Sequence, residues 1–520
     1  MVVAPVVKAL RDRGVFQLDF NGGVPFETIV EKTHGNRGYL RVALRLLCSC
    51  GWLESSGDIF RLTEKGGAAL HLAPAVYDEV VRFIPLAIFL EDFLMRKLQG
   101  SILPSLQVLI SRVKEGWDLP PPEDGSAGEA ARQIRLHADG VLVGPAMVAL
   151  ARAGVFNQLS RGPVEIKRLP GDQGCLAAIL ELLAAQGWAT RTGAKISLTS
   201  TGSYAAKVAT AYGVTVSYLP TFTVVSTLLF GNARIPRIDD SGVELLVNRA
   251  MNVWGSGGAH RTYFKKVDEI IIELFNRPLA QQPKGICDMG CGDGTFLEHL
   301  YSVVRDQTDR GKVLDQYPVI LVGADFNKVA RRVSAQRLRK AGIPSFHVIH
   351  GDINRPAQLA SAFEELGHDA HDFLHVRSFL DHNRPWVSPS NYVRGTRAAE
   401  TSGAFAHLGE EIAPDELEEN LARHLRRWAP YAGRFGLLVL ELHALPPEIT
   451  ARNLERTPAI AYEGTHGFSD QYLVELPVFL ECAKEAGFAR DMRFQARFPP
   501  SDLATVSINF FSAPGGLSAV

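Results

Sequence analysis

The sequence lacks an excess of charge of either sign. Its 520 residues include 55 lysines and arginines and 56 aspartates and glutamates, which give a formal net charge of −1. A protein that attracts nucleic acid through its overall electrostatic field needs a basic excess. The balance of charges therefore argues against nucleic acid as a partner.

Cysteine is scarce, and long apolar runs are missing. None of the six cysteines stands in a C-x2-C pair. The C-x-C arrangement of Cys48 and Cys50 has no second pair to complete a metal site, so core packing is the favoured interpretation. We therefore expect reduced thiols in a cytoplasmic protein. No stretch resembles a signal peptide or a membrane span, and we expect no membrane association.

The length requires more than one domain, because 520 residues exceed what one hydrophobic core usually serves. The chain enters a helical pattern by Val6-Val7 and ends in a glycine-rich stretch at Gly515-Gly516. These ends suggest a piece of a longer protein, although a short natural N-terminus gives the same pattern.

The first half contains a repeat. The segment 9–16, Ala-Leu-Arg-Asp-Arg-Gly-Val-Phe, recurs at 149–156 as Ala-Leu-Ala-Arg-Ala-Gly-Val-Phe, at an offset of 140 residues. The Leu-Leu and Gly-Trp pairs of 46–52 recur at 182–188, at an offset of 136. Such nearly constant spacing indicates a duplicated unit.

Each copy of the repeat, at about residues 5–75 and 145–212, has helices followed by a hairpin and resembles a winged helix. Gly57 and Gly193 supply the hairpin turns. A winged helix often binds DNA, but the helices before these hairpins are too apolar to read a groove. We therefore interpret residues 1–242 as a helical lid or dimerisation domain. A winged-helix regulator with a relic cofactor fold is the competing hypothesis.

Residues 243–520 show alternating helices and apolar strands, which is typical of an α/β domain with a largely parallel sheet. The first strand, 284–288, runs into a turn that contains Gly290, Gly292 and Gly294. Glycines at such a turn let the backbone approach a ligand closely. A dinucleotide-binding fold is one possibility, but its G-x-G-x-x-G spacing is missing.

The acid that ends the first strand favours another fold. Asp288 with Gly290, Gly292 and Gly294 forms D-x-G-x-G-x-G, which resembles the first motif of class I S-adenosylmethionine-dependent methyltransferases. The resemblance implies that Gly290 and Gly292 back the methionine part of the cofactor and that Asp288 receives its amino group. The expected fold class is α/β, with a Rossmann-like methyltransferase core at 243–520 and a mainly helical N-terminal lid that contains two winged-helix-like repeats.

The second strand, 319–325, supplies further candidates for cofactor binding. It ends in Asp325, whose two carboxylate oxygens suit both ribose hydroxyls. Phe326 follows directly and is included in the predicted cofactor site.

The third and fourth strands complete the predicted cofactor site. The third begins at Phe346 and leads to Asp352 and Ile353, and we expect Asp352 at the adenine amino group. The alternative for Asp352 is a helix N-cap. Arg377, in the fourth strand at 372–379, is the last predicted cofactor-binding residue.

Methyl transfer to oxygen or carbon requires removal of a proton, and two clusters offer this chemistry. Asp381-His382-Asn383 follows the fourth strand, where small-molecule O-methyltransferases keep a general-base histidine, although their L-H-D-W arrangement is absent. The segment Tyr462–Tyr472 follows the fifth strand, which contains Glu441. Within it, His466 and Gln471 are neutral ligands that can hold a divalent metal and leave positions open. A surface loop with an idle histidine is the alternative.

The duplicated lid, the segment Phe373–His382 and the segment Thr465–Tyr472 together resemble the loading-module C-methyltransferases of polyketide synthases, such as those of the apratoxin and gephyronic acid assembly lines. The resemblance implies a mononuclear iron, or manganese in its place, held by His466 and Gln471. It also implies a malonyl or methylmalonyl group on an acyl carrier protein as substrate, and neighbouring polyketide synthase domains as partners.

The implied reaction is methylation of the malonyl α-carbon. The metal binds the malonyl carboxylate and thioester carbonyl as a Lewis acid and stabilises the enolate, which attacks the cofactor methyl group. His382, Asp381, Tyr462 and Glu441 remain open as candidates for proton removal. The alternative is a metal-independent O-methyltransferase for a small phenol or alcohol, with His382 as general base.

Overall fold

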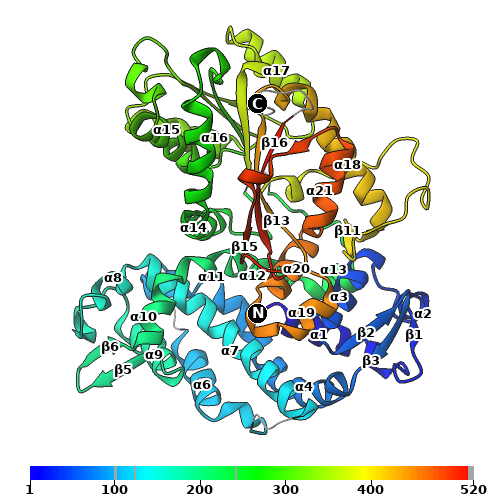
Figure 1. The fold of residues 1–520 in the computed structure, drawn as a ribbon. Coiled ribbons are helices and arrows are strands. Elements are labelled where there is room, and N and C mark those ends of the chain that lie inside the picture. The colour runs from blue at the N-terminus through cyan, green and yellow to red at the C-terminus, as the bar shows by residue number, and fades with distance from the viewer. Residues whose placement is uncertain (99–101, 122–124, 240–242, 513–520) are drawn as a thin grey trace.

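The computed structural model describes residues 1–98, 102–121, 125–239 and 243–512, with the side chains at 257–262 left out. The boundary expected at residue 242 and the glycine-rich stretch at Gly515-Gly516 lie outside the described residues, so the division into domains stays a prediction. Figure 1 shows a helical half that holds the N-terminus and a half built on a sheet that holds the C-terminus.

The helical half begins with the first copy of the repeat. Its elements are α1 (Val3–Asp12), β1 (Val24–Pro25), α2 (Phe26–Thr33), α3 (Arg37–Ser49), β2 (Leu53–Ser56), β3 (Ile59–Leu62) and α4 (Glu64–Ala87). Two connecting helices follow, α5 (Leu90–Leu94) and α6 (Leu103–Lys114). The strands pair in the order β1-β3-β2.

The second copy repeats this arrangement. Its elements are α7 (Ser126–Arg152), α8 (Val155–Leu159), β4 (Val164–Glu165), α9 (Gln173–Ala185), β5 (Ala189–Thr192), β6 (Lys195–Leu198), α10 (Ser200–Lys207), α11 (Ala209–Val216), α12 (Leu219–Thr223) and α13 (Val225–Phe230). Its strands pair in the order β4-β6-β5, as in the first copy. Gly57 and Gly193 take φ of 59° and 61° at the two hairpin tips. The predicted duplication is confirmed, and we call α1 to α13 the lid.

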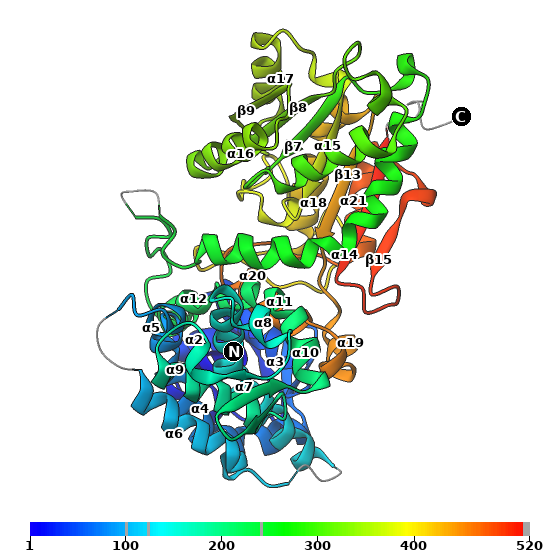
Figure 2. The same cartoon turned by 90° about the vertical axis from the view of Figure 1, so that its left-hand side faces the viewer.

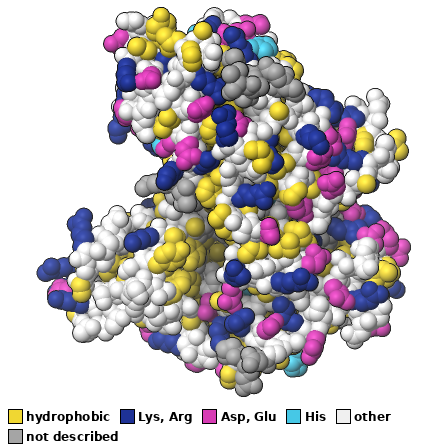
Figure 3. All heavy atoms as spheres, in the orientation of Figure 1, with side chains coloured by type: hydrophobic (Ala, Val, Ile, Leu, Met, Phe, Trp, Pro, Cys, Tyr) yellow, Lys and Arg dark blue, Asp and Glu magenta, His cyan; other side chains and the backbone are white. Residues whose placement is uncertain are grey.

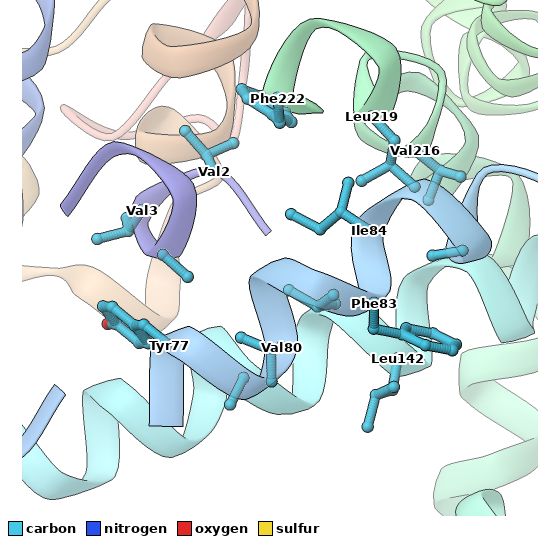
Figure 4. Close-up of a cluster of buried hydrophobic side chains, with 14 of the residues drawn as sticks. Val2, Val3, Tyr77, Val80, Phe83, Ile84, Leu142, Val216, Leu219 and Phe222 are labelled. Carbon is cyan, nitrogen blue, oxygen red and sulfur yellow. The ribbon is translucent and has the colours of Figure 1, made fainter. Parts of the chain in front are cut away.

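The long helices α4 and α7 pack along each other in the core of the lid. In the close-up of Figure 4, Val80, Phe83 and Ile84 of α4 lie beside Leu142 of α7, with Phe222 of α12 above them. Among the described residues, α7 is the one helix long and apolar enough to span a membrane, and the sequence analysis did not anticipate it. However, 67% of its most apolar window is buried inside the protein, as in a core helix.

The C-terminal half contains, in the part described, an eight-stranded sheet. The strands are β7 (Gly285–Met289), β8 (Ile320–Asp325), β9 (Phe346–His350), β10 (Phe373–Ser378), β13 (Leu437–Leu442), β14 (Ala489–Arg490), β15 (Ala496–Phe498) and β16 (Val506–Ser512). Their order is β14-β16-β13-β10-β7-β8-β9, and β15 also pairs with β16. The five strands from β13 to β9 are parallel, and β16 runs antiparallel to β13.

Helices cover both faces of this sheet. The helices of this half are α14 (Arg249–Phe275), α15 (Thr295–Gln307), α16 (Lys328–Lys340), α17 (Pro356–Glu365), α18 (Pro414–Ala432), α19 (Pro447–Arg452), α20 (Ala459–Gly467) and α21 (Leu476–Glu485), of which α19 and α20 pack on α3 of the lid. The first three pack on one face, and α17, α18 and α21 pack on the other. Figure 2 shows α14 lying between the sheet and the lid.

Several segments of the C-terminal half enter the core of the lid. Ala406, in the hairpin of β11 (Phe405–His407) and β12 (Glu410–Ile412), and Phe468, directly after α20, belong to the same buried cluster as the lid helices. The Phe468 ring stacks on Tyr39 of α3, with centroids 5.9 Å apart. On the face shown in Figure 3, charged side chains of both signs are interspersed over both halves, in keeping with the balanced composition.

Candidate active site

The glycine-rich turn between β7 and α15 borders open space. Gly290, Gly292 and Gly294 take φ of 81°, 54° and 81°, a conformation that residues with a Cβ rarely adopt. A Cβ added at Gly292 would meet no atom within 4 Å. The backbone of the turn is therefore accessible to a ligand.

Two acids, the buried Asp288 and the half-buried Asp325, flank this turn. Oδ1 of Asp288 is buried without a hydrogen-bond partner in the described part of the chain. Burial, assisted by the charge of Asp325, raises the pKa of Asp288 to about 8. Asp325 is tied down, because Oδ2 accepts from Gly292 N at 3.0 Å and Oδ1 from Asn327 N at 2.7 Å. A buried carboxyl group without a partner is costly, and a cationic amino group would satisfy Asp288.

Phe326, Asp352 and Ile353 lie beyond the ends of β8 and β9. The Phe326 ring is 71% exposed, and Ile353 is buried. Asp352 is not a helix N-cap, because α17 begins at Pro356 with Arg355 before it. Its Oδ1 accepts a hydrogen bond from Asn354 N at 2.9 Å instead. Contact of these three residues with the cofactor stays a prediction.

Arg377 and Asp381 form a fully buried ion pair. Arg377 Nη1 lies 2.5 Å from Asp381 Oδ1, which also bonds to His424 Nε2 at 3.0 Å, and the guanidinium stacks 4.2 Å from the Trp428 ring centre. Burial alone would raise the pKa of Asp381, but Arg377 and His424 outweigh it, and the net shift is downward. A carboxylate stabilised in this way is a poor base. The cofactor role predicted for Arg377 stays a prediction.

His382 and Glu441 form a buried hydrogen-bonded pair. His382 Nδ1 lies 2.5 Å from Glu441 Oε1, and the His382 backbone N donates to Oε2 at 3.2 Å. A carboxylate accepts the proton of Nδ1, so the lone pair of the neutral ring is on Nε2. Within the described ranges Nε2 has no hydrogen-bond partner, and it is not sealed from solvent. An imidazole held in this way is equipped to act as a general base.

The helix α20 carries His466 next to this pair. The segment expected as a loop begins as a helix, and His466 is only 3% exposed, which excludes the idle surface histidine. Its Nδ1 donates to the Tyr462 carbonyl at 2.8 Å, so Nε2 again has the lone pair. Burial, and then the nearby His382, lower the pKa of His466 to about 3, which keeps the ring neutral. The His382 and His466 rings meet edge to face, with centroids 5.1 Å apart.

Gln471 follows α20 and is held by its amide nitrogen. Nε2 donates to Tyr218 Oη and to Ser469 Oγ, both at 2.9 Å. His466 and Gln471 therefore each use one polar atom for positioning, and within the described residues His466 Nε2 and Gln471 Oε1, both uncharged, have no hydrogen-bond partner. This arrangement fits a metal site, since metal-ligating side chains are typically oriented through their other polar group. Tyr218 was missed by the sequence analysis, because no local motif marks a contact across 253 residues.

Leu380 packs between the glycine turn and the segment that contains His382. A Cβ added at Gly290 would come within 2.9 Å of Leu380 Cδ2, so the chain before His382 packs against the glycine turn. On the other side, Tyr472 N donates to the His382 carbonyl at 2.8 Å. The structure thus places the glycine turn, the His382–Glu441 pair and the segment with His466 and Gln471 around one region.

These features define the class of the protein. The parallel sheet with an antiparallel strand beside β13, the glycine turn after the first strand and the acids that end the first two strands are those of class I S-adenosylmethionine-dependent methyltransferases. The predicted α/β fold with a helical, winged-helix-containing N-terminal half is confirmed.

Comparison with protein families specifies the relationship further. Residues 244–509 match the AprA MT2-like domain, residues 139–232 the AprA winged helix domain, and residues 1–55 the AprA N-terminal domain. The first match spans more than half of the chain, and the chain belongs to the AprA MT2-like methyltransferases. The predicted family and enzyme class are confirmed.

Similar solved structures are methyltransferases at low sequence identity. The mitomycin 7-O-methyltransferase MmcR is 15% identical, with a TM-score of 0.44, over 75% of this chain and 100% of its own. An O-methyltransferase family protein from Burkholderia thailandensis is 11% identical, with a TM-score of 0.44, over 74% and 97%. The CurJ carbon methyltransferase is 12% identical, with a TM-score of 0.35, over 79% and 97%. No curated protein sequence matches the chain.

Proposed function

We propose that this methyltransferase acts in a polyketide synthase loading module, where it methylates the α-carbon of a malonyl or methylmalonyl group on an acyl carrier protein. The main support is one observation: in the part of the chain that the structure describes, two uncharged atoms with lone pairs, His466 Nε2 and Gln471 Oε1, have no hydrogen-bond partner, and His466 lies beside the His382–Glu441 pair. A carbon acid between two carbonyl groups needs a base and polarisation of its carbonyl oxygens, and this site has residues for both.

The residues fit the two groups that the family implies. Asp288, buried and without a partner, fits the amino group of S-adenosylmethionine, which supplies a methyl group on a positively charged sulfur. His466 and Gln471 would hold a divalent iron or manganese, which would supply Lewis-acid polarisation of the substrate carbonyls. Because both side chains are neutral, they would leave the charge of the ion undiminished.

We assign proton removal to His382. Its Nε2 takes the proton from the α-carbon, and Glu441 stabilises the imidazolium that results. The electron pair left on the carbon forms the new carbon–carbon bond as the carbon–sulfur bond of the methyl donor breaks. Asp381 is excluded as the base by its lowered pKa, and burial raises the pKa of the Tyr462 hydroxyl, so little phenolate forms.

The proposal is tested with the full chain, malonyl-acyl carrier protein and S-adenosylmethionine, followed by intact mass of the carrier. We expect a mass increase of one or more methyl groups, loss of turnover on chelation, and recovery with ferrous iron or manganese. Metal analysis of the purified protein accompanies the assay. Full turnover by demonstrably metal-free protein would contradict the metal-dependent reaction.

The His382–Glu441 pair also suits the alternative, a metal-independent O-methyltransferase in which His382 removes a hydroxyl proton. His466→Ala separates the two functions. In the proposed reaction the variant loses its metal and its turnover. In the alternative it retains turnover of a small phenol or alcohol in the presence of a chelator.

A further inference from the structure

The amide of Gln471 has a defined orientation. Ser469 Oγ donates its single proton to the Thr465 carbonyl at 2.6 Å, so it can only accept a hydrogen bond from Gln471. The Gln471 atom that lies 2.9 Å from Ser469 Oγ must therefore be the nitrogen. The other proton of this nitrogen is directed at Tyr218 Oη, also at 2.9 Å. With both N–H bonds in use, Oε1 is turned away from Ser469 and Tyr218.

Tyr218 brings this hydroxyl from the lid. It immediately precedes α12, is 2% exposed, and its ring centroid lies 5.9 Å from that of His466. Its neighbour Ser217 is bound to the start of α14, because its carbonyl accepts from Asn248 N at 2.8 Å and its Oγ from Asn252 Nδ2 at 3.0 Å. The chain at Tyr218 is thus held by hydrogen bonds to the start of α14, and its ring is buried beside His466.

The backbone before Gln471 is fixed by the lid as well. Asp470 takes φ of 58°, in the left-handed region. Its Oδ1 accepts from Tyr39 Oη at 2.6 Å, and its Oδ2 lies 3.3 Å from Arg237 Nη2. With the backbone held at Asp470, the orientation of the Gln471 side chain depends on its two hydrogen bonds, to Tyr218 and to Ser469.

We infer that Tyr218 is a positioning residue of the metal site, which acts together with Ser469 to hold the amide of Gln471 so that its oxygen, and not its nitrogen, is presented to the ion. The inference rests on the proposed function, in which Gln471 is a metal ligand. Tyr218 itself touches neither substrate nor metal. Metal binding by the C-terminal half then depends on a hydroxyl of the winged-helix part of the lid.

Manganese binding tests the inference without an activity assay. The metal-free full chain is titrated with Mn²⁺, and free Mn²⁺ is followed by electron paramagnetic resonance. We expect Tyr218→Phe to raise the Kd about tenfold, as is typical when the hydrogen-bond partner of a metal ligand is removed. Tyr204→Phe is the matched control, because Tyr204 lies in the same lid on α10 and is 68% exposed. An unchanged Kd in Tyr218→Phe overturns the inference, whereas no Mn²⁺ binding by the parent protein overturns the proposed metal site itself.

Introducing Tyr218→Phe into a Gln471→Glu protein distinguishes orientation of the Gln471 amide from a purely structural role of Tyr218. In Gln471→Glu the side chain ends in two oxygens, so no amide can turn its nitrogen toward the ion. Tyr218→Phe is expected to change the Kd by less than about threefold in this background, which makes the two substitutions non-additive. Equal losses in both backgrounds would show that Tyr218 has only a structural role. Thermal melting of each variant confirms that it is folded.

Discussion

The two parts of the site are built in different ways. The cofactor part lies in the backbone at the ends of neighbouring strands, where the glycine turn, Asp288 and Asp325 are close in sequence. The acceptor part is assembled from distant segments that contribute Tyr218, His382, Glu441 and the pair His466 and Gln471. A binding site formed by the backbone is difficult to alter by single substitutions, whereas side chains on separate segments can be substituted one at a time. We infer that the cofactor part sets the reaction class and the acceptor part sets the substrate.

The two parts also differ in which of their polar atoms have hydrogen-bond partners before a ligand binds. Oδ1 of Asp288 has no partner in the described part of the chain, so this group is satisfied only when the ligand arrives. In the acceptor part, His382 and His466 each have one nitrogen fixed by a hydrogen bond and one without a partner among the residues that the structure describes. If the two parts act separately, a substitution in one should leave the function of the other unchanged.

Loss of the general base is expected to have the largest effect. His382→Ala should lower kcat by about a thousandfold, within the range of two to four orders of magnitude for general acid–base catalysis. The affinity for S-adenosylmethionine, measured by calorimetry, should stay unchanged. Asn383→Ala, at an exposed neighbour, is the control. A large loss of cofactor affinity in His382→Ala would show that the two parts are not separate.

The buried ion pair is expected to contribute to stability rather than to cofactor binding. Arg377→Met leaves Asp381 charged and buried, so the free energy of unfolding should fall by about 3–5 kcal/mol. Adding Asp381→Asn should recover part of this loss, because no unpaired charge then remains. Urea unfolding measures both effects. If the folded Arg377→Met protein also binds S-adenosylmethionine much more weakly, Arg377 belongs to the cofactor part, as the sequence predicts.

The same division decides what the sequence could predict. The succession of strands along the chain, the duplicated hairpins and the turn after β7 follow from local periodicity and spacing, and the sequence is enough to predict them. The start of Tyr462–Tyr472 was expected as a loop, because Gly464 and Gly467 lower the helix propensity of this segment. It is helical in the structure, because packing of α20 against the lid stabilises the helix. The contact between Tyr218 and Gln471 spans 253 residues and exists only in the folded chain.

Adjacent residues show the same limit. Asp381 and His382 are neighbours, and the sequence left both open as the base. The short helical turn at Asp381–Asn383 directs Asp381 to Arg377 and His424, and it directs His382 to Glu441. Which side chain reaches the site is set by these buried partners, which no local pattern reveals.

Asp288 is expected to dominate cofactor binding. Asp288→Asn replaces a carboxylate that would pair with a cationic amino group, and a hydrogen bond to a charged group contributes about 1.5–3 kcal/mol. The Kd for S-adenosylmethionine should therefore rise about tenfold to a hundredfold, as measured by calorimetry. Asp293→Asn, a substitution of the same type at a half-buried position in the turn that bonds to Arg337, is the control.

The pH dependence examines the same carboxyl group. Burial raises the pKa of Asp288 from 3.8 to about 8 in the free protein, so at neutral pH the group must release a proton before it pairs with the cofactor. Affinity should therefore increase between about pH 6 and pH 8, with proton release, and this slope should vanish in Asp288→Asn. The unfolded chain ionises this group at lower pH than the folded chain, so the group lowers the stability of the free protein as pH rises through the window from 3.8 to about 8. A flat affinity of the parent protein over this range would contradict the assignment of Asp288.

Substitution of Phe326 is expected to have the smallest effect, and it should change cofactor affinity without changing the stability of the fold. Its ring is 71% exposed, so Phe326→Ala should leave the melting temperature of the free protein unchanged. If the ring lies against the adenine, its loss should cost about 1 kcal/mol of cofactor affinity, or about fivefold in Kd, as for other stacked aromatic pairs. Val329→Ala removes a neighbouring apolar side chain that is 57% exposed, and it should change neither quantity. Equal and small effects of the two substitutions would remove Phe326 from the predicted cofactor site.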